Sequence, residues 1–204
     1  MFKRVIPLLL ISKSKLIKTK KFKKRYYIGD PINTVKVFNE KYVDELVLLD
    51  IDASKDNYLN FDQIYNIVSE AFVPIAYGGG IKNKQDAKKI ISLGVEKIII
   101  NSESQNIDFI KELSESLGAQ SVVISLDFKK NFFGQFYLYQ KQKKITPLDN
   151  LKDFFINIQN YVGEIIVNSV DKDGTKSGFD HTLYYKISKY IKNPLVFCGG
   201  AASV

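Results

Sequence analysis

The segment Val73-Pro-Ile-Ala-Tyr-Gly-Gly-Gly-Ile-Lys82 predicts a short buried strand that stops at three glycines, after which a helix begins. Glycine has no Cβ, so consecutive backbone N–H groups can come close to a bound anion. The N-terminal end of the following helix adds partial positive charge at the same place. The segment therefore indicates a phosphate-binding turn between a strand and a helix.

A second copy of this turn lies near the C-terminus, in the segment Asn193-Pro-Leu-Val-Phe-Cys-Gly-Gly-Ala-Ala202. Pro74 and Pro194 are 194 − 74 = 120 residues apart, and the glycine pairs keep that spacing. Glu45 and Glu164 repeat at a similar spacing, 164 − 45 = 119 residues. The chain thus carries an internal repeat of about 120 residues.

Strands and helices are expected to alternate along the whole chain. The expected strands are the apolar segment before Gly78 and the ranges Val5–Ile11, Glu45–Ile51, Lys97–Asn101, Ser121–Phe128, Glu164–Val170 and Leu195–Cys198, with one arm of a small hairpin at Gly134–Tyr139. The expected helices begin at Asp30-Pro31 and otherwise span Phe61–Ala71, Gln85–Leu93, Ile107–Leu117, Asn150–Tyr161 and Thr182–Tyr190. Such alternation is typical of a parallel sheet with helical crossovers.

The repeat favours a closed barrel over an open sheet. A repeat that holds four β/α units implies an eight-unit (β/α)8 barrel, the TIM-barrel fold, of roughly 240 residues. The expected elements end with the seventh strand, so we predict one TIM-barrel domain over residues 1–204, truncated so that the eighth β/α unit is missing.

The charge of the chain is uneven. The formal net charge is +8, and eight cationic residues fall between Lys13 and Arg25. This basic segment is either a solvated loop or a flexible loop that closes over a polyanionic substrate. No helix-turn-helix or RNA-binding motif accompanies the charge, so a nucleic-acid partner is not expected.

The remaining composition excludes several classes of protein. A single cysteine, Cys198, rules out an internal disulfide framework and fits a reducing compartment. No signal peptide and no apolar run of membrane-spanning length is visible, which favours a cytoplasmic protein without a membrane partner. No His/Cys cluster or dinucleotide fingerprint is present, so no metal and no cofactor are expected. His181, the one histidine, is expected at the surface, and Cys198 in the core.

Three motifs together point to a family. They are Gly29-Asp30-Pro31, Tyr77-Gly78-Gly79-Gly80-Ile81 and Asp171-Lys172-Asp173-Gly174-Thr175-Lys176-Ser177-Gly178. The pattern resembles the cyclase subunit of imidazole glycerol phosphate synthase (HisF) and its paralogues, over nearly all of the chain. The resemblance implies a duplicated half-barrel whose enzyme takes ammonia from a glutaminase partner and closes an imidazole ring on a bisphosphate substrate.

The resemblance implies two phosphate sites. The first matches Gly79, Gly80, Asn101 and Ser102, and the second matches Gly174, Thr175, Gly199 and Gly200. Both fit the physical expectation that N–H groups and small side chains gather at the C-terminal ends of barrel strands. The alternative is that the glycines only make tight turns.

The acid/base pair implied by the resemblance is incomplete. Asp127 matches one carboxylate of that pair, with a helix cap as the alternative role, but Leu10 stands where the family has the other. Loss of one such group should lower the rate about 10² to 10⁴-fold. The Leu-rich first strand and Leu16-Ile17-Lys18-Thr19, with Lys18 in the substrate loop, resemble paralogues that serve amidation of a sugar nucleotide.

The resemblance also implies an ammonia gate. Arg4, Glu45, Lys97 and Glu164 match a ring of four charged residues at the opposite end of the barrel, and each lies at the start of an expected strand. The alternative is structural ion pairing, since the N-terminal face of a barrel usually serves stability.

Three functions therefore remain open. The favoured one is the synthase subunit of a glutamine amidotransferase that acts on a phosphorylated small molecule, in the sugar-nucleotide paralogue group. The second is the cyclase subunit of histidine biosynthesis. The third is a non-catalytic scaffold that binds a phosphorylated ligand and docks a glutaminase.

Overall fold

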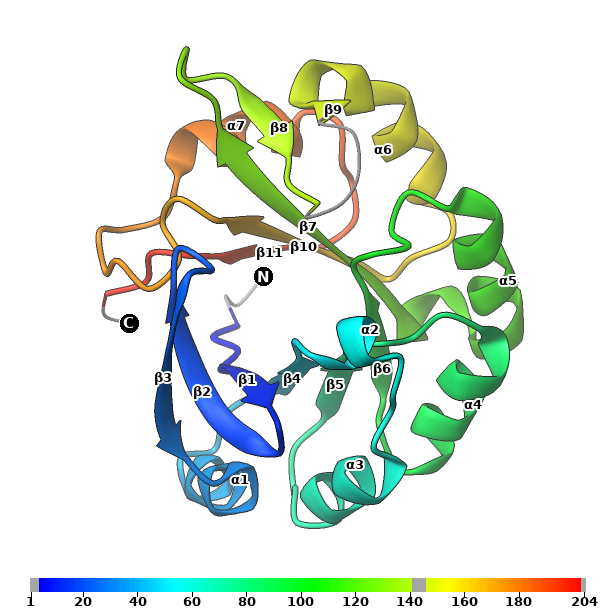
Figure 1. Cartoon of the computed structure of the whole chain (residues 1–204). Coiled ribbons are helices and arrows are strands. Elements are labelled where there is room, and N and C mark those ends of the chain that lie inside the picture. The colour runs from blue at the N-terminus through cyan, green and yellow to red at the C-terminus, as the bar shows by residue number, and fades with distance from the viewer. Residues whose placement is uncertain (1–3, 141–145, 203–204) are drawn as a thin grey trace. The chain divides into compact units, whose positions relative to one another are not determined.

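The structure, a computed structural model, describes residues 4–140 and 146–202. The chain forms two compact units. The first contains the described residues up to Lys18 together with Arg25–Ile100, and the second contains Thr19–Lys24 and the described residues from Asn101 onward. Both units are mixed α/β with parallel strands (Figure 1), which confirms the predicted alternation. Closure into one barrel and the single-domain assignment stay predictions.

The first unit is built on four parallel strands. Their order is β6-β5-β4-β1, with bounds Lys97–Ile100, Ile75–Gly78, Leu46–Asp50 and Leu8–Ser12. The helices of this unit are α1 (Pro31–Glu40), α2 (Ala53–Asp56), α3 (Phe61–Val68) and α4 (Lys84–Ser92). Figure 1 shows α1, α3 and α4 along one face of these strands, and their apolar residues Val35, Ile64 and Ile90 are buried there.

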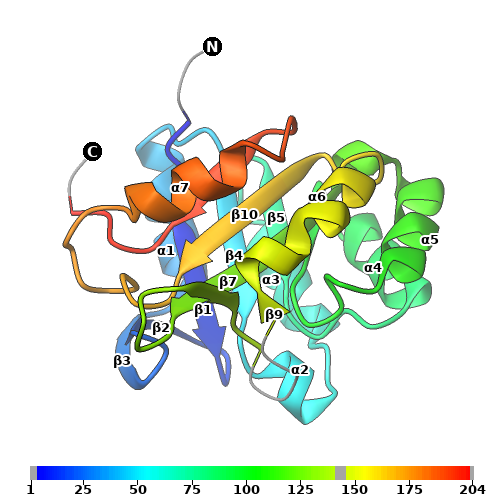
Figure 2. The ribbon, with the colours of Figure 1, turned by 90° about the horizontal axis from the view of Figure 1, so that it is seen from above.

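The second unit has three parallel strands and an antiparallel extension. The parallel strands run in the order β11-β10-β7, with bounds Leu195–Cys198, Glu164–Ser169 and Val122–Lys130. β8 (Phe136–Leu138) pairs with β7 and β9 (Thr146–Pro147) pairs with β8. The helices are α5 (Ile107–Leu117), α6 (Lys152–Ile158) and α7 (His181–Ser188), with 3-10 turns at Ala119–Ser121 and Leu148–Leu151. Figures 1 and 2 show α6 and α7 on the same face of this sheet.

Side-chain caps fix the starts of the helices. The carboxylate of Asp30 accepts a hydrogen bond from the Asn33 N–H, and Pro31 occupies the first turn, as predicted from the Asp-Pro pair. Asn60, Asn83 and Asn106 cap α3, α4 and α5 in the same way. These caps satisfy N–H groups that a helix leaves without partners. The expected stop of α5 at Gly118 is also confirmed.

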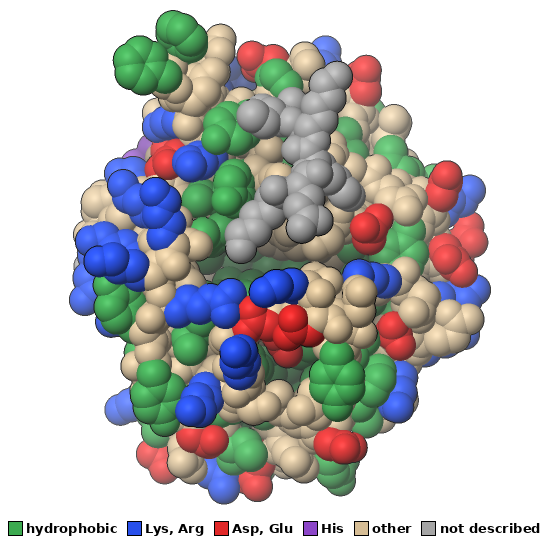
Figure 3. Space-filling model, viewed as in Figure 1, with side chains coloured by type: hydrophobic (Ala, Val, Ile, Leu, Met, Phe, Trp, Pro, Cys, Tyr) green, Lys and Arg blue, Asp and Glu red, His purple; other side chains and the backbone are tan. Residues whose placement is uncertain are grey.

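The basic segment between Lys13 and Arg25 is not a loop, which corrects our expectation. It forms two strands, β2 (Lys15–Lys20), which pairs antiparallel with β1, and β3 (Lys24–Gly29), which follows it as a hairpin. Leu16 and Ile17 are buried, whereas the lysines of β2 are exposed. Figure 3 shows Lys and Arg side chains gathered over this hairpin.

The first strand is also displaced from its predicted position. It spans Leu8–Ser12 rather than Val5–Ile11. Pro7 has no N–H to donate to the ladder, so regular pairing begins after it. The Pro7 carbonyl still accepts a hydrogen bond of 3.0 Å from the Val47 N–H.

Gly79→Ala should destabilise the chain by about 3 kcal/mol or more, because a Cβ at this position, where φ is +120°, would lie 2.2 Å from the Asp50 carbonyl oxygen. Gly134→Ala is the matched control: its φ is +75° and nothing lies within 4 Å of its added Cβ. That control should lose only about 1–2 kcal/mol. Urea unfolding of both variants measures the difference, and equal losses would refute the close approach at Gly79.

Candidate active site

Asp127 lies in the middle of a set of polar side chains in the second unit. It sits on β7, and the register pairs it directly with Asn168 on β10. One carboxylate oxygen accepts a hydrogen bond of 3.0 Å from Asn168 Nδ2, and the other accepts one of 2.9 Å from Asn101 Nδ2. Asn101 also donates to the Ser125 carbonyl at 3.0 Å. Asp127 is therefore held at both oxygens and does not cap a helix.

The protonation of Asp127 is shifted toward neutral pH. Burial raises the pKa of this carboxyl from 3.8 to about 6, while the two asparagine hydrogen bonds act in the opposite direction. The negative charge of Asp173 raises the pKa further. A carboxyl group with a pKa near 6 can both accept and donate a proton at neutral pH, as a general acid/base must.

Cys198 ends β11 beside this site. The register pairs it with Asn168, so Asp127, Asn168 and Cys198 form one row across three neighbouring strands. Burial, followed by the charge of Asp127, raises the pKa of the Cys198 thiol to about 11. The thiol is therefore neutral at physiological pH and a weak nucleophile.

The second glycine turn lies wholly within the second unit. The Gly178 N–H donates to the Gly200 carbonyl at 2.8 Å, which ties the loop after β10 to the turn after β11. At Gly200, where φ is +99°, an added Cβ would lie 2.2 Å from the Gly178 oxygen. Thr175 Oγ1 donates to the Lys172 carbonyl at 2.7 Å. The loop that carries Gly174 and Thr175 is thus tied through Gly178 to the turn of Gly199 and Gly200, whereas a phosphate site formed by these four residues stays a prediction.

The predicted first phosphate site is divided between the two units. Gly79 and Gly80 belong to the first unit and Asn101 and Ser102 to the second, so an anion site shared by all four stays a prediction. The Gly80 N–H donates to Ser54 Oγ at 3.1 Å. Next to it, a pocket of about 630 Å³ in the first unit is lined by residues that include Asp62, Gly80, Lys82, Asn83, Asp86 and Lys89.

A charged cluster lies at the opposite ends of the strands of the first unit. Glu45, only 4% exposed, accepts hydrogen bonds from Lys97 Nζ at 2.9 and 3.0 Å and from Arg4 Nη1 at 3.1 Å. Glu164, the fourth predicted member, starts β10 of the second unit, so the four-residue ring stays a prediction.

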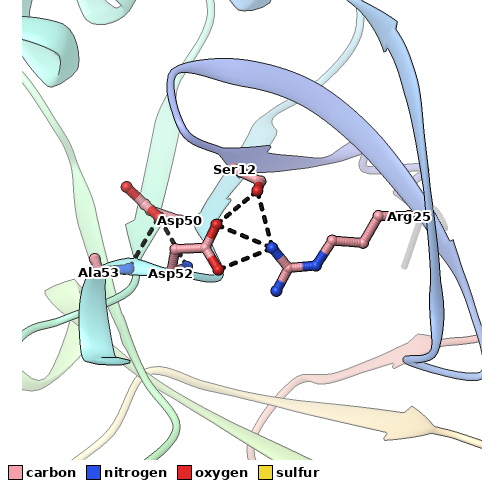
Figure 4. Close-up of polar contacts among 5 residues, drawn as sticks. All are labelled: Ser12, Arg25, Asp50, Asp52 and Ala53. Atoms are coloured by element: carbon pink, nitrogen blue, oxygen red, sulfur yellow. Dashed lines mark hydrogen bonds and ion pairs between the residues drawn. The ribbon is translucent and has the colours of Figure 1, made fainter. Parts of the chain in front are cut away.

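A second polar network in the first unit, around the buried Ser12 and Asp52, was not predicted from the sequence (Figure 4). Arg25 Nη1 lies 2.9 and 3.0 Å from the two Asp52 oxygens and donates to Ser12 Oγ at 3.0 Å. Ser12 Oγ in turn donates to Asp52 at 2.6 Å. Burial disfavours the charged form of Asp52, but the bonds from Ser12 and Arg25 outweigh it and lower its pKa. The network attaches β3 of the hairpin to the ends of β1 and β4.

Asp50 lies close to that network but has different partners. Its carboxylate accepts hydrogen bonds of 3.0 and 3.1 Å from the N–H groups of Asp52 and Ala53 at the start of α2. Burial raises the pKa of Asp50, and the neighbouring Asp52 charge adds to the rise. The sequence did carry a signal for Asp50 and Asp52, because both acidic residues lie at the end of an apolar strand. Arg25, the partner of Asp52, lies 27 residues away in the sequence, so the ion pair could not be predicted from local pattern.

The tip of the basic hairpin is held by Asp173 within the second unit. Asp173 Oδ2 accepts hydrogen bonds from Thr19 Oγ1 at 2.8 Å and from the Phe22 N–H at 3.2 Å. The Asp173 carbonyl accepts a third from the Lys21 N–H at 3.0 Å. The motif that follows β10 thus serves both the glycine turn and the hairpin tip. Lys18 lies in β2 with an exposed side chain.

The described residues hold neither a metal-ligating cluster nor a membrane-spanning helix. Within 4–140 and 146–202, no group of three or more His, Cys, Asp or Glu side chains is arranged to hold a metal ion. Among the helices of the same residues, none is long and apolar enough to cross a membrane. His181 is exposed at the start of α7, as expected.

The raised pKa of Asp127 makes a prediction about stability. The folded protein binds more protons than the unfolded chain between pH 3.8 and about 6. The contribution of Asp127 to the free energy of unfolding should therefore fall as pH rises through that window, by about 3 kcal/mol, and stay low above it. Asp127→Asn should abolish this fall, whereas Asp149→Asn, at an exposed position, should retain it. Urea unfolding between pH 4 and pH 7 tests this, and identical profiles for the wild type and Asp127→Asn would contradict it.

Comparison with known proteins places this chain in a family. The model of the family described as "Histidine biosynthesis protein" matches residues 4–204. A Pseudomonas aeruginosa protein, named as a candidate imidazole glycerol phosphate synthase subunit hisF2, is 44% identical over 208 residues, covering 99% of this chain and 82% of that protein. A Vibrio vulnificus protein, named as a candidate subunit hisF3, is 42% identical over 206 residues, with 98% and 79% coverage.

A relative that is named as a HisF subunit without the word "candidate" shares a lower identity with this chain. The imidazole glycerol phosphate synthase subunit HisF of Alkaliphilus metalliredigens is 35% identical over 205 residues, which cover 99% of this chain and 81% of that protein. The match to the family model and this degree of identity over almost the whole chain lead to one conclusion: the chain belongs to the HisF family of histidine biosynthesis proteins.

Proposed function

We propose that this chain is the synthase subunit of a glutamine amidotransferase, which receives ammonia from a glutaminase partner and uses it on a phosphorylated substrate. The single observation that carries the proposal is Asp127, a carboxyl group clamped by two amides with a pKa of about 6. Such a group can accept the proton that ammonia must lose after it attacks an electrophilic carbon. The glycine turn with Gly174 and Gly200, in the same unit, supports a phosphate-binding role.

Within that proposal we favour a sugar-nucleotide acceptor over the histidine precursor. Leu10 on β1 pairs in register with Leu49 on β4 and has no proton to transfer. A ring closure that needs two carboxylates therefore lacks one of them at this position. The names of the nearer relatives above, hisF2 and hisF3, are consistent with additional copies whose substrate has changed.

The histidine-pathway cyclase is the second candidate. It is favoured by the retained Asp127 and by relatives such as the Alkaliphilus subunit, which carries the synthase name. The two candidates differ in one measurable respect, the turnover of imidazole glycerol phosphate synthesis with ammonium as the nitrogen source.

We expect turnover in that assay to lie at least about 10²-fold below that of a relative with both carboxylates, because one acid/base group is absent. Leu10→Asp should raise the turnover, since it places a carboxylate on β1 at the position where the acid/base group is absent. Leu10→Asn is the matched control, of nearly the same shape but unable to transfer a proton, and should give no gain. Wild-type turnover equal to that of the two-carboxylate relative would reject the sugar-nucleotide assignment.

The cluster around Glu45 predicts how nitrogen enters. If it gates ammonia from a docked glutaminase, Lys97→Met should lower glutamine-dependent product formation about tenfold or more, because Glu45 would be left paired only with Arg4. Activity with free ammonium should stay within about twofold of wild type. Lys88→Met, on the exposed side of α4, is the control and should change neither rate. An equal loss with both nitrogen sources would assign the cluster a structural role.

A further inference from the structure

Asn168 occupies the centre of the row formed with Asp127 and Cys198. On one side the register places it beside Asp127, and on the other beside Cys198. Its side-chain N–H group donates to Asp127 Oδ1 at 3.0 Å. Asn168 is the only strong side-chain hydrogen-bond donor to Asp127 in this row, because the Cys198 thiol is a weak donor.

The other half of the Asn168 amide has no hydrogen-bond partner. Asn168 Oδ1 is buried, and no described residue donates to it. It lies against Gly199, whose added Cβ would come within 3.0 Å of this oxygen. An unsatisfied buried acceptor is destabilising and rare in folded proteins, so its retention calls for a compensating role.

The orientation of the amide indicates what that role is. If the amide were flipped, Oδ1 would face Asp127. It could then accept a hydrogen bond only from the neutral Asp127 carboxyl, and it would repel the carboxylate. The observed orientation presents the N–H instead and leaves Oδ1 unsatisfied. It therefore favours the ionised carboxylate over the neutral acid.

We propose that Asn168 is a positioning residue that fixes the orientation of the Asp127 carboxylate and keeps it ionised for the reacting ligand. Asn101 performs the matching task at the second oxygen, at 2.9 Å. The inference rests on the proposed function in one respect, that Asp127 is the carboxyl that reacts.

The groups around Asp127 leave this task to the amides. Asp173, in the loop after β10, acts on Asp127 through its negative charge and opposes ionisation. Cys198, on β11, is a neutral thiol at physiological pH, because burial raises its pKa. No Lys or Arg among the described residues forms an ion pair with Asp127, whose hydrogen bonds come from the two amides. Removal of Asn168 therefore leaves one donor against burial and the charge of Asp173.

The test is a direct titration of Asp127 by carboxyl ¹³C NMR, with the resonance assigned by its absence in Asp127→Asn. In Asn168→Leu, of similar size, the pKa of Asp127 should rise by about one to two units, as expected for the loss of one hydrogen bond to a charged group. The ionised fraction at pH 7 should then fall about two- to tenfold, and kcat with it. Asn168→Asp keeps the shape but adds a second carboxyl, and should raise the second apparent pKa of the pair further.

Asn193 provides the structural control. Its Nδ2 donates to the backbone carbonyls of Gln159 and Val162 at 3.1 and 2.7 Å, in the same unit but away from Asp127. Asn193→Leu should lower stability and leave the Asp127 titration unchanged. An unchanged pKa of Asp127 in folded Asn168→Leu or Asn168→Asp, or an equal shift in Asn193→Leu, would overturn the proposal. The titration needs no substrate, so it tests the role of Asn168 even if the chain lacks the proposed activity. The expected rise in the pKa of Asp127 without any turnover would count against the proposed function alone.

Discussion

A carboxylate enclosed by apolar strands loses its hydration, and the polar chemistry of both units follows from how each such group is compensated. Asp127 receives two amide N–H groups and, among the described residues, no cation, so its charge is only partly stabilised. Glu45 receives a lysine and an arginine, and Asp52 an arginine and a serine. The bonds from Ser12 and Arg25 lower the pKa of Asp52, whereas at Asp127 burial outweighs the two neutral donors and raises the pKa. The choice of partner thus separates carboxylates held in ion pairs from one held by neutral amides.

Parallel strands place these groups at opposite ends of each unit. In the first unit, Glu45 and Lys97 stand where β4 and β6 begin, while Ser12 lies at the end of β1. In the second, Asp127 and Asn168 lie towards the ends of β7 and β10, next to the glycine turn. Because every parallel strand runs the same way, a residue at a strand start cannot reach one at a strand end. In each unit, the polar groups at the strand starts are therefore kept apart from those at the strand ends by the direction of the chain.

The sequence was sufficient for features that depend on local pattern. The alternation of strands and helices, the cap at Asp30 and the stop of α5 at Gly118 follow from composition within a few residues. The basic hairpin was not predicted because its lysines obscure the alternation of apolar and polar residues that indicates a strand. Only Leu16 and Ile17 mark its buried side. The network of Ser12, Arg25 and Asp52, and the pairing of Asn168 with Asp127, depend on which residues meet across strands. Such contacts between strands cannot be predicted from the spacing of residues along the chain.

The attachment of the hairpin tip to Asp173 has a consequence for synthesis of the chain on the ribosome. Thr19 and its partner Asp173 are separated by 154 residues. At about 5–20 residues per second, roughly 8–30 s pass between the emergence of the two. During that interval the tip lacks its carboxylate partner, and until Tyr139 is made it also lacks the Phe22–Tyr139 ring contact, while its lysines are already exposed. The nascent hairpin is thus a cationic segment beside the polyanionic surface of the ribosome, and it can dock only after β10 has been made.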